Sequence, residues 1–234
     1  MAADRKLINR VRASLRDAAE PAKAPGMQAY MKSVMPYMGV SAGPARKVTR
    51  SAFKVCPLAT FEDWSDTALA LWREAKFREE RYAAQDLVGY PRYATFQSPA
   101  CMPMYEELIV DGAWWDHVDD VAIHRIGPLL VDYRDDIEPV MRAWSTDEDM
   151  WRRRTSIICQ VGAKAEIDLG LLYDCIEPNM ADTEFFIRKA IGWALRSHAW
   201  LNHAEVVRYV NAHEDQLSGL SKREALKNMG KLLP

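Results

Sequence analysis

Helical patterns recur along the whole of this 234-residue chain, while patterns typical of β-strands are almost absent. No stretch sustains the alternation of β-branched and polar residues that a half-buried strand shows. Segments with apolar residues at helical spacing are instead separated by short loops, which favours antiparallel helix pairs. The sequence therefore predicts an all-α protein of roughly a dozen helices.

Proline, glycine and capping residues mark the expected helix ends. Gly39 suits the C-terminal end of a helix, and Thr60 resembles an N-terminal cap. We expect a further helix to end at Gly127-Pro128 and another to open within residues 145–149. The remaining expected helices cover residues 4–19, 27–37, 45–55, 60–76, a partly exposed 79–88, 104–110, 113–126, 129–133, 137–144, 166–177, 183–198, 204–212 and 222–229.

Three tryptophans suggest an internal repeat. Trp115, Trp151 and Trp193 are separated by 36 and 42 residues, near the period of about 40–47 residues of HEAT and armadillo repeats. This spacing favours an α-solenoid of HEAT-like antiparallel helix pairs over a compact helical bundle. We expect residues 1–234 to form a single domain, in which stacked pairs present one concave face.

Charge is balanced overall but unevenly distributed. The formal net charge is -2, so the total does not indicate a nucleic-acid-binding protein. Acidic residues gather in 111–149, and basic residues gather in 46–54, 152–154 and 188–196. A bipolar surface with one positive face available to phosphates is one interpretation, and ordinary solvated helix faces are the other.

The chain shows no sign of membrane insertion or export. Charged residues interrupt every apolar run before it reaches the roughly 18 residues of a membrane span. The first residues lack the apolar core of a signal peptide, which predicts a cytoplasmic protein. Four isolated cysteines are expected to be reduced thiols in the core: Cys56, Cys101, Cys159 and Cys175.

An aromatic residue and a charge lie close together at each of the three repeated tryptophans. Trp115 and Asp119 are four residues apart, so on a helix they share one face, where they suit a cation. Trp151 precedes two arginines, and Trp193 precedes Arg196. Arginine suits phosphate, and tryptophan can contact a base or a sugar. The alternative is that these tryptophans pack in the core and the charges face solvent.

Other chemistry has little support in the sequence. The five histidines form no HExxH arrangement, which argues against that type of metal site. No glycine-rich phosphate loop joins a strand to a helix, and no nucleophile is paired with a suitable base.

Four motifs, in order over most of the chain, resemble the HEAT-like-repeat DNA glycosylases of the AlkD type, which are DNA alkylation repair enzymes. They are the stretch from Tyr30-Met31-Lys32 to Gly39-Val40, Trp114-Trp115-Asp116-His117-Val118-Asp119, Trp151-Arg152-Arg153-Arg154-Thr155-Ser156-Ile157, and Lys189-Ala190-Ile191-Gly192-Trp193-Ala194-Leu195-Arg196. The resemblance implies a monomer without metal or cofactor whose concave face binds double-stranded DNA. Such an enzyme excises cationic alkylated purines, N3-alkyladenine and N7-alkylguanine, by hydrolysing the N-glycosidic bond, with no need to flip the lesion fully out of the duplex.

The resemblance also implies roles for individual residues. The catalytic carboxylate falls on Asp119, and the two active-site tryptophans fall on Trp115 and Trp193. Contacts to DNA are expected from Arg153, Arg154, Arg196, Tyr30, Lys32 and Arg46. The slightly acidic net charge departs from the basic character common in this family, and it predicts DNA binding that is weak or strongly dependent on salt.

Two other functions are compatible with the sequence. The first is a noncatalytic helical-repeat protein that binds DNA structures, which would depend on Arg154 and Arg196 but release no base. The second is a protein-binding solenoid whose interface is the acidic region 111–149. Base release separates the glycosylase from both, and a salt titration of DNA binding separates the two alternatives from each other.

Overall fold

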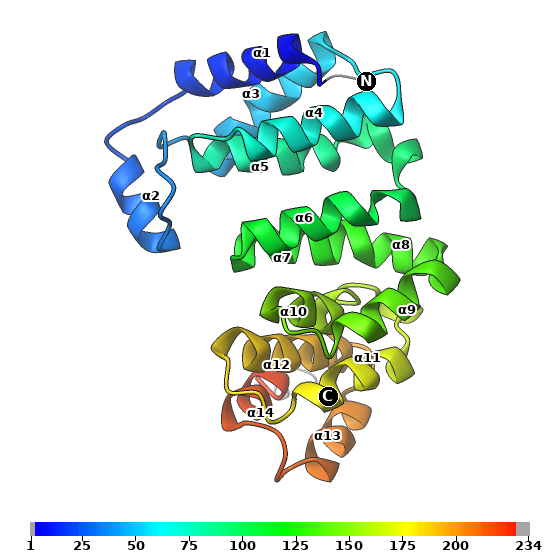
Figure 1. The fold of residues 1–234 in the computed structure, drawn as a ribbon. Helices are drawn as coiled ribbons and strands as arrows, with labels where there is room; N and C mark the ends of the chain where they lie inside the picture. The colour runs from blue at the N-terminus through cyan, green and yellow to red at the C-terminus, as the bar shows by residue number, and fades with distance from the viewer. Residues whose placement is uncertain (1–2, 228–234) are drawn as a thin grey trace. The chain divides into compact units, whose positions relative to one another are not determined.

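A computed structural model describes residues 3–227 of the chain, and every regular element in this range is helical (Figure 1). The described residues form fourteen α-helices, α1 to α14, with four short 3-10 segments and one π-helical segment at intervals between them. The prediction of an all-α protein is confirmed. Contacts divide the chain into two compact units, Met1–Gln97 and Ser98–Pro234. That the whole chain is a single domain stays a prediction.

The first unit contains five α-helices and a cluster of aromatic side chains between α4 and η1. Its elements are α1 (Arg5–Asp17), α2 (Ala24–Met31), α3 (Ala42–Val55), α4 (Phe61–Arg73), α5 (Arg78–Val88) and η1 (Pro91–Phe96). α1 packs on α3, and α5 packs on both α3 and α4. Trp64 is fully buried, contacts Phe61 and Tyr93, and donates its indole N–H to the carbonyl of Leu87.

The expected helix at 27–37 is wrong at its C-terminal end. α2 ends at Met31, and Lys32 adopts the left-handed conformation of a helix cap, with φ 49°. The loop that follows is held by Glu79, whose carboxylate accepts hydrogen bonds from the backbone amides of Met38, Gly39 and Val40. Gly39 therefore lies in this loop rather than at a helix end.

The same contact corrects the expected exposure of residues 79–88. Glu79 and Glu80 at the start of α5 are both almost fully buried. Burial of a carboxylate is tolerated when charged or polar partners compensate it. The Glu79 carboxylate accepts the three backbone amides named above, and the Glu80 carboxylate forms an ion pair with Arg12 of α1 at 3.0 Å.

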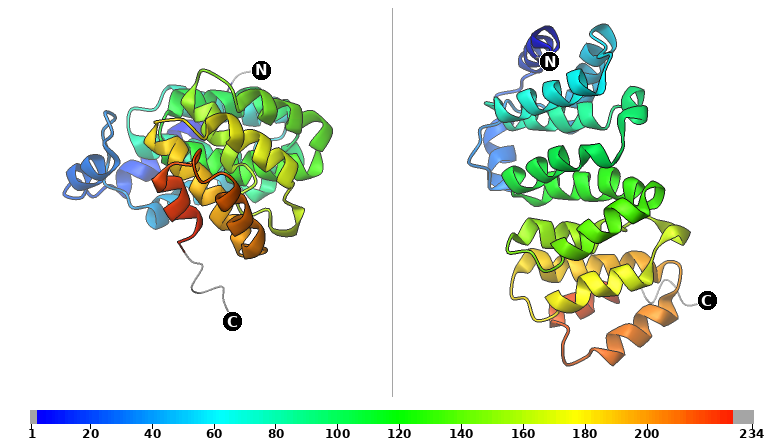
Figure 2. Two further views of the ribbon diagram at one scale, coloured as in Figure 1. Left: turned by 90° about the horizontal axis from the view of Figure 1, so that it is seen from below. Right: turned by 45° about the vertical axis from the view of Figure 1, so that its right-hand side comes forward.

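The second unit stacks its helices in successive pairs (Figures 1 and 2). α7, α10 and α12 follow one another in contact, while α9 contacts α11 beside them. This stacking agrees with the expected HEAT-like helix pairs. The elements are η2 (Pro99–Cys101), α6 (Met102–Gly112), α7 (Trp115–Val121), η3 (Ala122–Ile126), α8 (Gly127–Asp132), α9 (Arg134–Trp144), α10 (Met150–Ile158), η4 (Lys164–Glu166), α11 (Leu169–Ile176), η5 (Glu177–Asn179), α12 (Phe185–Ala199), α13 (His203–Ala212) and α14 (Gly219–Ala225).

The helix expected at 113–126 neither begins nor ends where the sequence pattern indicated. α7 begins at Trp115, passes through the π-helical segment η3 and continues without a break into α8, which ends at Asp132. Pro128 is the second residue of α8 and directly follows the π-helical segment, so it does not end the helix. A Cβ atom on Gly127 would lie 2.5 Å from the carbonyl oxygen of Cys159, so glycine here permits close packing against the end of α10.

Several other expectations from the sequence are confirmed. Thr60 caps α4 by accepting the amide of Asp63, and Asp149 caps α10 by accepting two amides. The four cysteines are buried free thiols. The bounds of the last expected helix, 222–229, are wrong, because α14 begins at Gly219 and ends at Ala225. Residues 228–229 lie outside the described part of the chain. No helix within residues 3–227 is long and apolar enough to cross a membrane.

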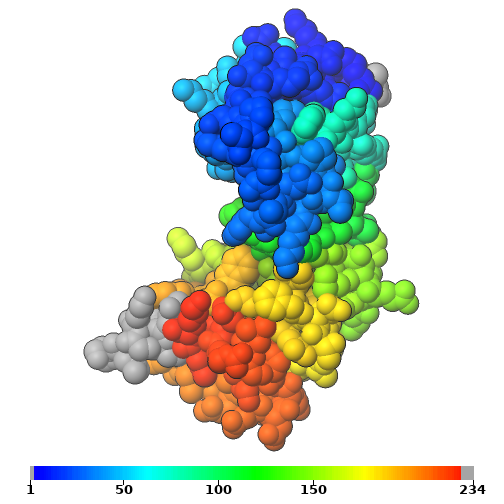
Figure 3. Space-filling model, turned by 90° about the vertical axis from the view of Figure 1, so that its left-hand side faces the viewer, coloured from blue at the N-terminus to red at the C-terminus, as the bar shows by residue number. Residues whose placement is uncertain are grey.

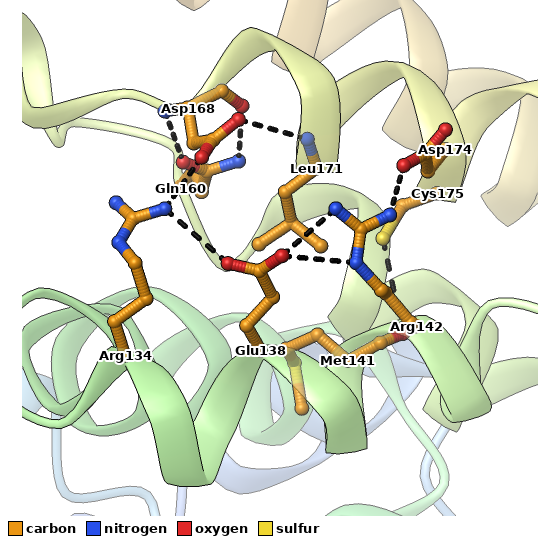
Figure 4. Close-up of polar contacts among 9 residues, drawn as sticks. All are labelled: Arg134, Glu138, Met141, Arg142, Gln160, Asp168, Leu171, Asp174 and Cys175. Atoms are coloured by element: carbon orange, nitrogen blue, oxygen red, sulfur yellow. Dashed lines mark hydrogen bonds and ion pairs between the residues drawn. The ribbon is translucent and has the colours of Figure 1, made fainter.

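A chain of ion pairs joins α9 to α11 on the surface of the second unit (Figure 4). Arg134 pairs with Asp168 at 2.5 Å and with Glu138 at 3.4 Å. Arg142 pairs with Glu138 at 2.8 Å and also contacts Asp174. These groups are partly exposed, so each pair is expected to add about 0–1 kcal/mol to stability. The network supports the stacking of the helices.

Candidate functional site

Residues from α7, α10 and α12 line a cavity of about 350 Å³ in the second unit. The lining residues are Trp115, Asp119, Arg154, Phe185, Phe186, Lys189, Trp193 and Arg196. Five of them were expected to contribute to the site from the sequence. The stacking of three helices therefore brings together residues that lie up to 81 positions apart in the chain.

The cavity begins with α7, which presents Trp115 and Asp119 one turn apart. Ala113 has a positive φ of 40° and Trp114 is extended, so the chain turns sharply before the helix starts. Trp114 packs against Trp151 and Phe186, with ring centroids 6.3 and 5.3 Å away. Trp115 is left 37% exposed at the cavity, where its ring is accessible to a ligand.

Asp119 is held in place by Arg154 of α10. The guanidinium Nε and Nη2 each lie 2.8 Å from a different carboxylate oxygen, which is a bidentate ion pair. Nη1 of Arg154 donates to the carbonyl oxygen of Phe186 at 2.6 Å. The side chains of Asp119 and Arg154 are only 15% and 5% exposed. These contacts fix the direction in which the carboxylate faces the cavity.

Burial and the ion pair act on the Asp119 carboxyl in opposite directions. Burial raises its pKa, because the charged form loses hydration, and Asp116 adds a smaller repulsion. The hydrogen bond and charge of Arg154 lower the pKa but do not cancel the effect of burial. A carboxyl with a raised pKa in a cavity is a common property of functional sites.

Trp151, the second of the three repeated tryptophans, and Arg153 do not line the cavity. Trp151 is 7% exposed and packs against Phe186, with ring centroids 5.0 Å apart. The alternative in which this tryptophan packs in the core is therefore correct for Trp151. Arg153 pairs with Asp182 at 3.0 Å and donates to the carbonyl oxygens of Asp147 and Glu148. A role for Arg153 in DNA binding stays a prediction.

α12 lines the cavity with aromatic and basic residues along one face. Phe185, Lys189, Trp193 and Arg196 follow one another at intervals of four, four and three residues, which places them on one side of a helix. Phe185 is 58% exposed. Phe185, Phe186 and Lys189 also line the cavity and were not among the expected site residues, although helical spacing from Trp193 indicates Phe185 and Lys189.

The two cations of α12 share a counter-ion. Glu224 of α14 lies 2.8 Å from Nζ of Lys189, and its other carboxylate oxygen contacts Arg196. The hydrogen bond from Lys189 has the largest effect on the pKa of the Glu224 carboxyl and lowers it. Burial raises this pKa, but the hydrogen bond from Arg196 lowers it further, and the net result is a pKa of about 2. Glu224 is therefore ionised at neutral pH.

The remaining expected DNA contacts belong to the first unit. Tyr30 in α2 is 79% exposed, and Lys32 directly follows this helix and is also exposed. Arg46 in α3 is exposed and pairs with Asp86 at 3.1 Å. All three side chains face solvent on their own unit, and their contact with DNA stays a prediction.

The chain as a whole is similar to known proteins of one family. A family model described as DNA alkylation repair enzyme matches residues 11–229. A solved structure described as a predicted DNA alkylation repair enzyme from Enterococcus faecalis is similar to this chain, with a TM-score of 0.81 and 26% sequence identity. The similarity covers 91% of this chain and 97% of the other. No curated protein sequence matches this chain.

Proposed function

We propose, from the premise that this chain belongs to the DNA alkylation repair enzyme family, that it is a DNA glycosylase. Its substrates would be cationic alkylated purines in duplex DNA, N3-alkyladenine and N7-alkylguanine, and it would act as a monomer without a cofactor. The observation that carries the proposal is the fixed carboxylate of Asp119 in a cavity that it shares with Trp115 and Trp193.

The chemistry requires stabilisation of a positive charge on the sugar. An N-alkylated purine is already cationic and leaves with the electron pair of the glycosidic bond, so positive charge builds on C1′ and the ring oxygen of the deoxyribose. Asp119 can stabilise this charge electrostatically and orient the water that attacks C1′. The water then loses a proton to solvent, and the products are the neutral alkylated base and an abasic site.

Trp115 and Trp193 suit the same transition state. The faces of their rings carry negative charge density and attract the electron-poor C–H groups of a developing oxocarbenium ion. Both side chains line the cavity together with the carboxylate of Asp119. This arrangement supports binding of the sugar between two aromatic rings and one anion.

Arg154 has enough donors to bind Asp119 and a DNA phosphate at the same time. A guanidinium carries five N–H groups, and the contacts to Asp119 and to the Phe186 carbonyl use one on each nitrogen. One N–H on Nη1 and one on Nη2 remain for another acceptor. We infer that these donors contact the backbone phosphate beside the lesion.

The composition of the cavity supports excision without full flipping of the base. Enzymes that flip a base read its Watson–Crick edge with hydrogen-bonding groups in a pocket. The eight lining residues include aromatic, basic and acidic side chains but no asparagine, glutamine, serine or threonine. These residues suit a sugar and phosphates better than the edge of a base.

The test is release of N3-methyladenine and N7-methylguanine from methylated duplex DNA. Asp119→Asn keeps the size of the side chain but removes its charge, and it is expected to slow release by about 100-fold or more. Asp120→Asn is the matched control, because Asp120 follows on the same helix, lies near Arg125 and does not line the cavity. Equal release by wild type and Asp119→Asn would refute the proposed role of Asp119.

Absence of release by the wild type would have a different meaning. If the protein is folded and binds duplex DNA but frees no methylated base, the noncatalytic DNA-binding alternative is correct. Circular dichroism and a DNA titration on the same preparation distinguish this outcome from an inactive sample.

A further inference from the structure

Glu224 pairs with two of the three cations that line the cavity, although it does not line the cavity itself. Its side chain is 13% exposed, compared with 35% for Lys189 and 20% for Arg196. Arg196 also donates to the backbone carbonyl of Glu224 at 3.2 Å. Lys227 approaches the same carboxylate at 4.0 Å but is 63% exposed. The pairs with Lys189 and Arg196 are thus the better shielded contacts.

The position of Glu224 depends on unusually close packing between α12 and α14. A Cβ atom on Gly192 would lie 2.4 Å from the Cβ of Glu224 and 2.8 Å from the carbonyl oxygen of Ser221. The hydroxyl of Ser221 donates to the carbonyl of Arg188 at 3.1 Å. The two helices lie side by side in Figure 1, and α14, coloured red, reaches the surface of the second unit in Figure 3.

The charges around the cavity explain why such a counter-ion matters. Three lining residues are positive, Arg154, Lys189 and Arg196, and only Asp119 is negative. A cationic base would be repelled by this excess, while any phosphate backbone would be attracted to it. The carboxylate of Glu224 in α14 offsets one of these positive charges.

We propose that Glu224 is a positioning residue that sets the selectivity of the cavity for cationic lesions over undamaged DNA. It holds Lys189 and Arg196 beside Trp193 and lowers the positive potential that both present to the backbone. The inference rests on the proposed function, because it concerns the same cavity and the same cationic substrate. Without the charge of Glu224, the cavity binds undamaged duplex DNA more tightly, and its preference for DNA with a cationic base over undamaged DNA becomes smaller.

The test compares Glu224→Gln with Glu205→Gln in the full-length protein. Glu205 of α13 also pairs with an arginine, Arg208, and accepts a hydrogen bond from Tyr173, and contacts led by the hydrogen bond from Arg208 likewise lower its pKa to about 2. Glu205 does not line the cavity or contact its cations. Each variant raises the net charge by one, so a difference between them reflects position rather than total charge.

Binding to an undamaged duplex is measured over a range of salt concentrations. Glu224→Gln is expected to bind several-fold more tightly at low salt, with a log–log salt slope steeper by about 1, as for one additional neutralised phosphate. Undamaged duplex should also compete more strongly against release of N7-methylguanine from methylated DNA. Glu205→Gln and the charge-conserving Glu224→Asp should keep the wild-type slope and competition.

Two outcomes would overturn the inference. Equal behaviour of Glu224→Gln and Glu205→Gln would mean that only total charge matters. Weaker binding by Glu224→Gln, with rescue by Glu224→Asp, would mean that Glu224 supports the fold of α12 and α14 without limiting DNA binding. The proposed function is judged separately by base release from the wild type, so failure of the inference about Glu224 can be distinguished from failure of the proposed function.

Discussion

The carboxylate of Asp119 and the guanidinium of Arg154 form a bidentate ion pair, with both N–O distances at 2.8 Å, at the wall of the cavity in the second unit. The pair links α7 to α10 and keeps a negative charge next to two tryptophans. Its partners are 35 residues apart in the sequence. The geometry of the proposed active site therefore depends on how successive helix pairs stack.

Replacement of Arg154 should affect both activity and stability. In Arg154→Ala the buried carboxylate of Asp119 loses its partner, which typically costs about 3–5 kcal/mol of unfolding free energy. Arg154→Lys can restore a charge but not two parallel hydrogen bonds, so partial recovery is expected. Urea unfolding and base release measure the two effects. If Arg154→Ala has the unfolding free energy and the base-release rate of the wild type, the Asp119–Arg154 ion pair has no role in stability or activity.

The raised pKa of Asp119 predicts a pH dependence of activity. Burial is the main cause of this increase, and Arg154 opposes it. Because the ionised carboxylate is the active form in the proposal, base release should decline as the pH falls through a pKa above that of an exposed aspartate. Single-turnover rates of base release, measured from about pH 4 to pH 8 at intervals of about half a pH unit, test this expectation.

The raised pKa of Asp119 also affects stability, but in the opposite direction with pH: activity falls at low pH, whereas the contribution of this group to stability falls at high pH. The folded state binds the proton of Asp119 more tightly than the unfolded chain does, so this group favours folding below the unfolded pKa. That contribution is lost as the pH rises through the folded pKa. The difference in melting temperature between wild type and Asp119→Asn should therefore change with pH over this window. A constant difference would indicate a normal pKa.

Gly192→Ala should separate α12 from α14. Its new methyl group would meet the Cβ of Glu224 at 2.4 Å and a backbone oxygen at 2.8 Å, so one helix must shift. Overpacking of this kind typically costs about 1–3 kcal/mol. A thermal melt measures the loss, and Gly26→Ala, at a position with open space around it, is the control. Equal melting temperatures would contradict the close packing.

Glu79→Gln should loosen the loop between α2 and α3. The carboxylate of Glu79 accepts hydrogen bonds from the amides of Met38, Gly39 and Val40, and an amide side chain has only one accepting oxygen. Leaving buried donors unsatisfied typically costs about 1–3 kcal/mol. Hydrogen exchange of the three amides should accelerate relative to those of α4. Unchanged protection would mean that the carboxylate does not hold this loop.

Local rules of helix structure accounted for much of the fold and for part of the site. The four-residue spacing of Trp115 and Asp119 was enough to place both on one face of α7, because i and i+4 positions overlap. The caps at Thr60 and Asp149 followed from side chains that accept backbone amides. These features depend on a few neighbouring residues, so the sequence contains the information directly.

Features that depend on packing between distant segments could not be predicted in this way. The early end of α2 reflects a loop held by Glu79, which lies 41 residues from Met38. The Asp119–Arg154 pair and the role of Glu224 depend on which helices become neighbours. Trp151 shares the spacing of Trp115 and Trp193, but the packing of Phe186 and Trp114 places it in the core.

The most direct test of the central claim is a single-turnover measurement of N7-methylguanine release from a methylated duplex. Enzyme is kept in excess of DNA at low ionic strength, because a net charge of -2 predicts binding that weakens with salt. We expect release by wild type and by Asp120→Asn, and a rate lower by about 100-fold or more in folded Asp119→Asn. Equal rates in all three proteins, or no release by folded wild type bound to the duplex, would contradict it.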